Sequence, residues 1–327
     1  MGDYTLVIGS SNLDIKGRLL NPAIPGSSNS ARVRTAHGGV GRNIAENLAR
    51  LGSEVVLLTV VGDDNAGDEL LDALETQGVD VSRALRVADT PTGVYLAALD
   101  HTGDLMVGLD DLEIAQRMTA SYLSDNADAF FDCDMVVLDL NLSDTALERA
   151  LELGRTAGKP ICVDPTTDER AVRLVDYLSE IDIITPNMTE AEAILEAACK
   201  ARPDLVEALS HIQDPDRALQ TARRLVYLGV NTVVVTQAER GACYATEFES
   251  GHFPAVKVDI VDTTGAGDSL TATLVFGLTH EIGLSDAVQL GLRAAAMTLR
   301  ESATVAPGMS LDALYSGISQ AGIPQEP

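Results

Sequence analysis

Residues 262–276 read DTTGAGDSLTATLVF, a glycine-rich turn that leads into a long apolar helix. Gly265 and Gly267 stand where this helix begins, and the unpaired backbone N–H groups and helix dipole there favour an anion. Because glycine has no side chain, a phosphate can approach the backbone closely. Asp268, in the first turn, can accept a proton from a substrate hydroxyl beside that anion. The stretch therefore predicts phosphoryl transfer; the alternative is that Asp262 or Asp268 only caps the helix.

On the N-terminal side of this stretch, short apolar runs alternate with helical patterns. Runs typical of buried strands occupy 4–9, 55–61, 135–140, 160–164, 182–185 and 232–236, and helical patterns occupy 38–52, 66–77, 145–157, 189–199 and 218–228. Strands joined by crossover helices predict an α/β fold, a three-layer, doubly wound and mostly parallel sheet with helices on both faces. Ligands of such sheets bind beyond the carboxyl ends of the strands.

Two stretches interrupt this alternation. Residues 14–34 combine strand-like pieces with a Pro/Gly/Ser/Asn-rich middle, and residues 92–107 have the alternation and central turn of a β-hairpin. Since these strands lack helices of their own, we expect them to form a small sheet that covers a cleft. The prediction is a single domain over residues 1–327 with lid segments at about 14–36 and 92–108. The alternative is an edge hairpin without function.

The composition excludes several classes of function. The chain has 327 residues, and its 23 Lys and Arg against 49 Asp and Glu give a net charge of −26. Nucleic-acid binding needs clustered cations and a membrane span needs about 18 or more apolar residues in a row; the sequence has neither. The N-terminal residues show no secretory leader pattern. The cysteines have no metal-ligand spacing and indicate reduced, mostly buried thiols of a cytoplasmic protein: Cys133, Cys162, Cys199 and Cys243.

Four motifs follow one another along the chain: Asn12-Leu13-Asp14, GGVGRN at 38–43, Asn187-Met188-Thr189-Glu190 and DTTGAGD at 262–268. Together they resemble the ordered signatures of the ribokinase-like (PfkB) carbohydrate kinases, which phosphorylate sugar and nucleoside hydroxyls with ATP. The resemblance covers essentially the whole chain. It implies the ribokinase-like fold, a lid over the acceptor, and a small-molecule substrate.

The resemblance also implies roles for the motif residues. Asp268 is then the general base, and the N–H groups of Gly265, Ala266 and Gly267 hold the transferring phosphoryl group. The acceptor hydroxyls are bound by a set from the first two motifs: Asn12, Asp14, Gly39 and Asn43. For Asp14, the alternative is a turn residue at the end of the first strand.

On the nucleotide side, the resemblance implies that Asn187, Thr236 and Gly241 contact ATP and that Glu190 acts on Mg²⁺ through water. The structural alternatives are a first-turn glutamate that stabilises a helix dipole and a simple turn at the end of the strand at 232–236. Many relatives also bind a monovalent cation. Here Asp262 and the backbone of Thr264 would be its ligands, with carbonyl groups of residues 300–307, and we expect it to be K⁺. Lys16 and Arg18 either read the acceptor or keep the lid soluble.

Further segments resemble the pseudouridine kinases within this family, among them GGVGRNIAENLARLG at 38–52 and Leu138–Leu142. Ribokinases usually carry a lysine in the glycine-rich segment and a glutamate where Asn141 stands, so both departures disfavour free ribose. We expect 5′-phosphorylation of pseudouridine, with Asn141 in the acceptor site or, alternatively, as a strand-end cap. Two other functions fit the sequence: a kinase of ribose, uridine or inosine, and a non-catalytic nucleoside-binding protein. The lid of the family often pairs with another lid, which suggests a homodimer.

Overall fold

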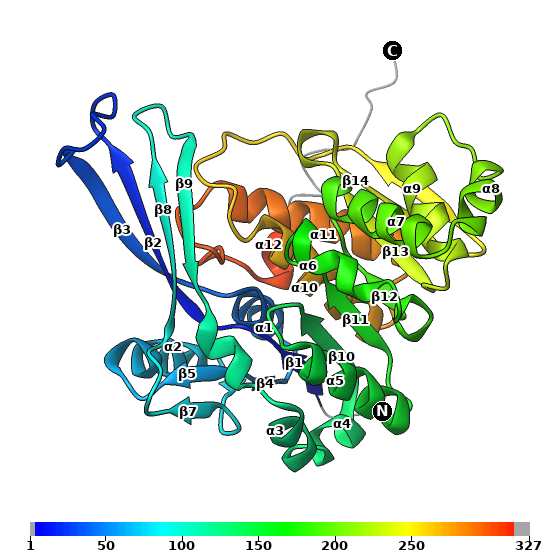
Figure 1. The fold of residues 1–327 in the computed structure, drawn as a ribbon, viewed down its shortest axis with the longest axis horizontal. Coiled ribbons are helices and arrows are strands. Elements are labelled where there is room, and N and C mark those ends of the chain that lie inside the picture. The colour runs from blue at the N-terminus through cyan, green and yellow to red at the C-terminus, as the bar shows by residue number, and fades with distance from the viewer. Residues whose placement is uncertain (1–3, 317–327) are drawn as a thin grey trace.

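The large sheet forms the centre of the molecule (Figure 1). The computed structural model describes residues 4–316, and within them nine strands have the order β15-β14-β13-β12-β11-β10-β1-β4-β6. Neighbours from β13 to β6 are parallel, and β14 and β15 add an antiparallel edge. The strands are β1 (Tyr4–Ile8), β4 (Val55–Leu58), β6 (Val79–Asp80), β10 (Cys133–Asp139), β11 (Ile161–Asp164), β12 (Ile183–Ile184), β13 (Thr232–Thr236), β14 (Ala242–Ala245) and β15 (Ser250–Phe253). Residues 1–3 and 317–327 of the expected domain lie outside the described part.

Helices cover both faces of this sheet, which confirms the predicted fold class. In β1, Leu6 and Ile8 join one hydrophobic core and Val7 joins the other, because successive side chains of a strand point to opposite faces. The first core is covered by α3 (Ala120–Asp125), α4 (Asp128–Asp132), α5 (Asp144–Ala157), α7 (Met188–Ala201), α8 (Asp204–Ser210) and α9 (Arg217–Tyr227). The second is covered by α1 (Val40–Leu51), α2 (Asn65–Thr76), α10 (Ala266–Thr279), α11 (Leu284–Leu299) and α12 (Leu311–Ser316). The short α6 (Asp168–Ala171) follows β11.

The strand expected over 55–61 is two strands in the structure. β4 lies in the large sheet, whereas β5 (Val60–Gly62) pairs with β7 (Leu85–Val87) in a separate two-stranded sheet. Between them, the Thr59 hydroxyl donates to Ser11 Oγ at 2.9 Å, and the Thr59 carbonyl accepts from the Leu85 N–H. The apolar pattern could not reveal this break, because the side chains of both pieces are buried.

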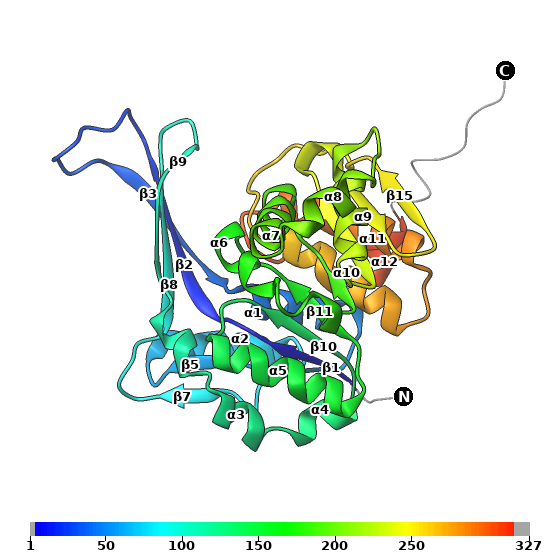
Figure 2. The same cartoon turned by 45° about the vertical axis from the view of Figure 1, so that its right-hand side comes forward.

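A second, four-stranded sheet projects from the main body (Figures 1 and 2). Its order is β3-β2-β8-β9, with β2 (Asn12–Leu19), β3 (Ala31–Gly38), β8 (Gly93–Leu99) and β9 (Leu105–Asp111). These strands come from the two segments expected to interrupt the α/β alternation, and we call the sheet the lid. β2 begins four residues after β1 ends, so the lid rises from the carboxyl-end edge of the large sheet.

The other sequence expectations that the structure tests concern burial. Cys133, Cys162 and Cys243 are buried and Cys199 is half-buried, as expected for the thiols. None of the helices in residues 4–316 combines the length and apolarity that crossing a bilayer requires.

Candidate active site

The glycine-rich turn lies at the N-terminus of α10. Gly265 precedes the helix with a φ of 84°, and a Cβ there would lie 1.9 Å from the Thr304 carbonyl oxygen, so only glycine fits. At Gly267, a Cβ would meet no atom of the described residues within 4 Å. Open space therefore adjoins the first N–H groups of α10, which have no acceptor within the helix. This arrangement can accept a phosphoryl group.

Asp268 is buried beside this N-terminus. Asn43 Nδ2 from α1 donates to Asp268 Oδ2 at 2.7 Å. Burial raises the pKa of Asp268 to about 7, with the charges of Asp139 and Asp14 adding to the effect and the Asn43 hydrogen bond opposing it. A carboxyl group that titrates near neutral pH is suited to accept a proton from a hydroxyl.

The residues expected to bind the acceptor come together from the lid and α1. Asn12 Nδ2 donates to Asp14 Oδ1 at 2.7 Å, and both side chains are buried at the base of β2. Gly39 precedes α1 with a φ of 99°, and Asn43 lies in the first turn of that helix. Asp14 is near enough to Asp268 for its charge to raise the pKa of that carboxyl group. The N-termini of α1 and α10 thus meet the base of the lid.

Arg42 holds Asn43 in place, a role that sequence reasoning missed. Its buried guanidinium donates to the His37 carbonyl at 3.1 Å, to Asn43 Oδ1 at 2.9 Å and to Thr304 Oγ1 at 3.2 Å. It also pairs with Glu46, one helical turn further on. The sequence does carry a signal for this role, because Arg42 and Glu46 stand four residues apart on one helix, directly after the glycines.

Asp139 was also missed as a site residue, although it ends a buried strand. Its Oδ2 accepts from Ser10 N at 2.7 Å, Ser10 Oγ at 2.8 Å and Gly41 N at 2.8 Å, and its Oδ1 accepts from Asn141 N at 2.8 Å. One carboxylate therefore joins the ends of β1 and β10 to the start of α1. Asn141 Nδ2 donates to Ser10 Oγ at 3.0 Å, while Asn141 Oδ1 is buried without a partner among the described residues.

The residues expected at the nucleotide lie along the same sheet edge. Asn187 and Glu190 form a capping box at the start of α7, in which Glu190 accepts from Asn187 N at 2.8 Å and from Asn187 Nδ2 at 2.7 Å. Asn187 is bridged to Thr236 at the end of β13. Gly241 closes the following turn with a φ of 98°. Within that turn, Gln237 Nε2 is buried and lacks a partner in residues 4–316.

Asp164 ends β11, which lies between β10 on the acceptor side of this sheet edge and β12 on its nucleotide side. Thr271 Oγ1 of α10 donates to Asp164 Oδ2 at 3.2 Å. Burial raises the pKa of Asp164 well above its ordinary value, and the charges of Asp268 and Glu190 raise it further. The sequence left the role of the loop after Asp164 open. The structure brings this carboxylate into contact with α10, the helix that carries the candidate base.

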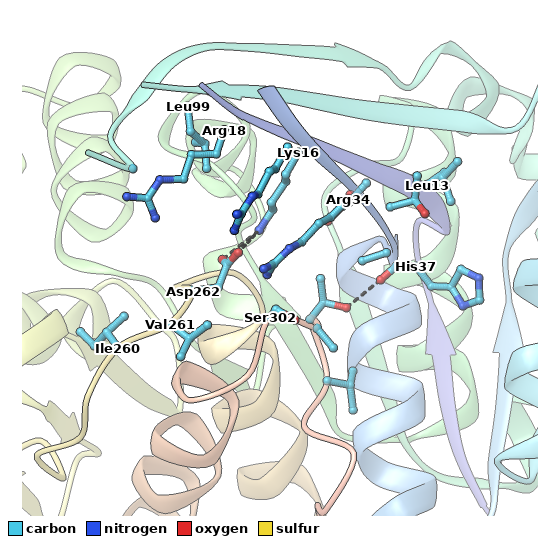
Figure 3. A pocket seen from close by; sticks show the side chains of 18 of the residues that line it. Leu13, Lys16, Arg18, Arg34, His37, Leu99, Ile260, Val261, Asp262 and Ser302 are labelled. Carbon is cyan, nitrogen blue, oxygen red and sulfur yellow. Dashed lines mark hydrogen bonds and ion pairs between the residues drawn. The ribbon is translucent and has the colours of Figure 1, made fainter. Parts of the chain in front are cut away.

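The residues expected to bind a monovalent cation contact a lysine of the lid. Lys16 Nζ lies 2.8 and 2.7 Å from the two carboxylate oxygens of Asp262 (Figure 3). It also lies 2.6 Å from Thr264 Oγ1. Lys16, Arg18 and Arg34 extend into a cleft of about 930 Å³ between the lid, α1 and the loops around 260–262 and 302–307.

Comparison with known proteins identifies the class. Residues 3–310 match the family model of the pfkB family carbohydrate kinases. The chain belongs to this family and is a kinase of sugars or nucleosides.

Among its relatives are two nucleoside kinases. The pseudouridine kinase of Escherichia coli strain K12 is 31% identical over 320 residues, covering 98% of this chain and 97% of its own. The guanosine-inosine kinase of Exiguobacterium acetylicum is 31% identical over 311 residues, covering 94% and 98%. A ribokinase-like protein of Escherichia coli, solved with ATP and Mg²⁺, shares the fold with a TM-score of 0.80 at 19% identity over 97% of this chain and 99% of its own.

Proposed function

We propose that this chain phosphorylates the 5′-hydroxyl of pseudouridine with ATP. The observation that carries the proposal is the convergence of Asp14, Asn43 and Asp268 on the open N-terminus of α10. The choice of nucleoside is supported by the similarity to a pseudouridine kinase. It is also supported by the lack of a lysine in the glycine-rich segment and by Asn141, which stands where ribokinases usually carry Glu. ATP as donor also favours a cytoplasmic place of action.

In the proposed mechanism, Asp268 takes the proton of the acceptor hydroxyl as that oxygen attacks the terminal phosphoryl group. The acceptor is oriented by the buried Asn12 and Asp14, which bind ribose hydroxyls, and by Gly39 and Asn43 at the start of α1. The N–H groups of Gly265, Ala266 and Gly267 stabilise the charge of the phosphoryl group in transfer. We expect Asn187, Thr236 and Gly241 to contact the nucleotide.

The donor set fits Mg²⁺ held mainly through water. Both carboxylate oxygens of Glu190 already accept hydrogen bonds from Asn187, and the charge of Glu190 opposes ionisation of the buried Asp164 by raising its pKa. A hydrated divalent cation would offset that repulsion, since Mg²⁺ keeps several waters. Glu190 and Asp164 would hold it, and it would neutralise phosphate charge.

The expected K⁺ site at Asp262 and Thr264 does not fit its ion in this way. The Asp262 carboxylate and the Thr264 side chain are already bound to the Lys16 ammonium. A second cation on the same carboxylate would meet a like charge at short range.

Asn141 is our candidate for recognition of the base. Pseudouridine presents an N1–H donor that uridine lacks, and the buried Asn141 Oδ1 has no partner among the described residues. A site that hydrogen-bonds such a donor rejects the analogue without it, because the acceptor is then left unpaired.

A panel of acceptors tests the proposal. Pseudouridine, uridine, inosine, guanosine and ribose are compared with ATP and Mg²⁺, with ADP release and product mass as readouts and Asp268→Asn as the control for contaminating kinases. We expect kcat/KM for pseudouridine to exceed that for uridine by at least about tenfold, or roughly 1.4 kcal/mol. In Asn141→Ala, this ratio should shrink mainly through slower turnover of pseudouridine.

Equal efficiency on pseudouridine and uridine would reject the assignment but leave the kinase chemistry intact. Preference for guanosine or inosine is the second candidate outcome, favoured by the 31% identity to the guanosine-inosine kinase. Nucleoside binding with neither ADP release nor a phosphorylated product would support a nucleoside-binding protein instead.

We also propose that the chain forms a homodimer through the outer face of the lid. Ile15, Leu96 and Leu109 are neighbours in the lid register and point away from the face of Asp14 and Lys16. Leu109 is 57% exposed and Val33, on the same outer face, is 65% exposed. A contiguous exposed apolar face of this kind marks an interaction site.

A further inference from the structure

Lys16 connects the lid to the anion-binding turn. It lies two residues after Asp14 on β2, so both side chains point to the same face of the lid. From there its ammonium contacts both oxygens of Asp262 at 2.8 and 2.7 Å (Figure 3) and the hydroxyl of Thr264 at 2.6 Å. The side chains of Lys16 and Asp262 are only 17% and 21% exposed, so water screens this ion pair less than a surface pair.

The same carboxylate shapes the turn. Asp262 Oδ1 also accepts from Thr264 N at 2.9 Å, which folds the chain directly before Gly265. Through these contacts, Asp262 ties its cationic partner to the backbone of the turn.

That partner belongs to the chain itself. The resemblance to the family implies a free monovalent cation held by Asp262, the Thr264 backbone and carbonyl groups of residues 300–307. In the structure, the Lys16 ammonium occupies Asp262, the one side chain of that set, and also contacts the Thr264 hydroxyl. An ammonium carries the same single charge as K⁺ and donates three hydrogen bonds, all of which have acceptors here.

We propose that Lys16 replaces the free monovalent cation of this site and orders the anion-binding turn from the lid. Two consequences follow. Order in the turn does not require K⁺, and it depends on the position of β2, the strand that also carries Asp14. Lys16 is thus a positioning residue: it couples the position of β2, which carries the acceptor-binding Asp14, to the order of the turn that binds the phosphoryl group. The inference rests on the proposed role of the turn but not on the identity of the nucleoside.

The test compares K⁺ with choline at equal ionic strength in the full chain, in Lys16→Met and in Arg18→Met. Arg18 is the matched control because it lies on the same face of β2 but donates to the His101 and Thr102 carbonyls. The readouts are the thermal unfolding midpoint and kcat with the best acceptor. We expect the wild type and Arg18→Met to change less than about twofold in kcat on removal of K⁺. Lys16→Met should lose at least about tenfold in choline and recover with K⁺, and its midpoint should rise by about 2–4 °C on addition of K⁺.

A wild-type chain that loses tenfold in kcat or melts several degrees lower without K⁺ would overturn the proposal. So would a folded Lys16→Met that responds to K⁺ in neither readout. The wild-type salt comparison keeps the test decisive if Lys16→Met does not fold. If no acceptor is turned over, the proposed function fails, while the melting comparison still tests Lys16.

Discussion

Asp268 is buried among other carboxylates, yet it must be ionised to accept a proton. In Asp268→Asn, the carboxamide keeps the shape and can still contact Asn43, but it cannot take the proton. We expect kcat to fall by about 10²–10⁴-fold while the nucleoside Kd, measured by calorimetry, changes little. An undiminished kcat would refute the role of this residue as general base.

The same burial gives Asp268 a pH signature. Because its pKa is raised to about 7, kcat/KM should fall about tenfold per pH unit below that value.

The raised pKa of Asp268 also affects stability. Between the ordinary value of 3.8 and about 7, the native state binds a proton that the unfolded chain releases. The contribution of this group to the free energy of unfolding therefore decreases as pH rises through that window. Urea unfolding should show Asp268→Asn to be more stable than the wild type above about pH 7, with a smaller difference near pH 4. A constant difference would contradict the raised pKa.

At the scale of elements, the N-terminus of α10 is kept open by its glycines. In Gly267→Val, the branched side chain would fill the space in which a phosphoryl group is expected. We predict that kcat falls much more than nucleoside affinity. Folding stability should not fall, because valine has a higher helix propensity than glycine.

Gly283→Val is the matched control for this prediction. Gly283 also stands at the start of a long helix, with no described atom within 4 Å of a Cβ, but it lies outside the candidate site. Steady-state kinetics and thermal unfolding of both variants provide the check. If Gly267→Val loses stability and activity in parallel while Gly283→Val does not, the glycine is structural rather than part of an anion site.

At the scale of the whole molecule, the lid has two different faces. The inner face carries Asp14 and Lys16, and the outer face carries Leu96 and Leu109. We predict a mass near twice 34.5 kDa in sedimentation or light scattering at micromolar concentration. Leu109→Asp should shift it toward the monomer, since a charge in an apolar contact is costly.

Val206→Asp serves as the control for this shift. Val206 is 59% exposed on α8, away from the lid, and should leave the mass unchanged. A wild-type chain that stays monomeric at high concentration would contradict the dimer.

Much of the fold follows from local pattern. Period-two and helical periodicities predicted the parallel strands and most of the crossover helices that build the large sheet, and the class was confirmed. The break at Thr59 and the antiparallel edge of β14 and β15 were not predicted. Both depend on which strand pairs with which, and a buried apolar run has the same appearance in either sheet.

The sequence by itself determined the motif residues that build the site, because a glycine turn before a helix and a carboxylate in its first turn carry their chemistry within a few adjacent residues. Only the tertiary structure decided which distant groups act on them. Asp139 fixes Gly41 from 98 residues away, and Lys16 binds Asp262 from 246 residues away. The pKa of Asp268 is set by burial and by neighbouring charges from other segments. Such long-range electrostatic and hydrogen-bond contacts have no local sequence pattern, since they arise only when the sheet and the lid bring the segments together.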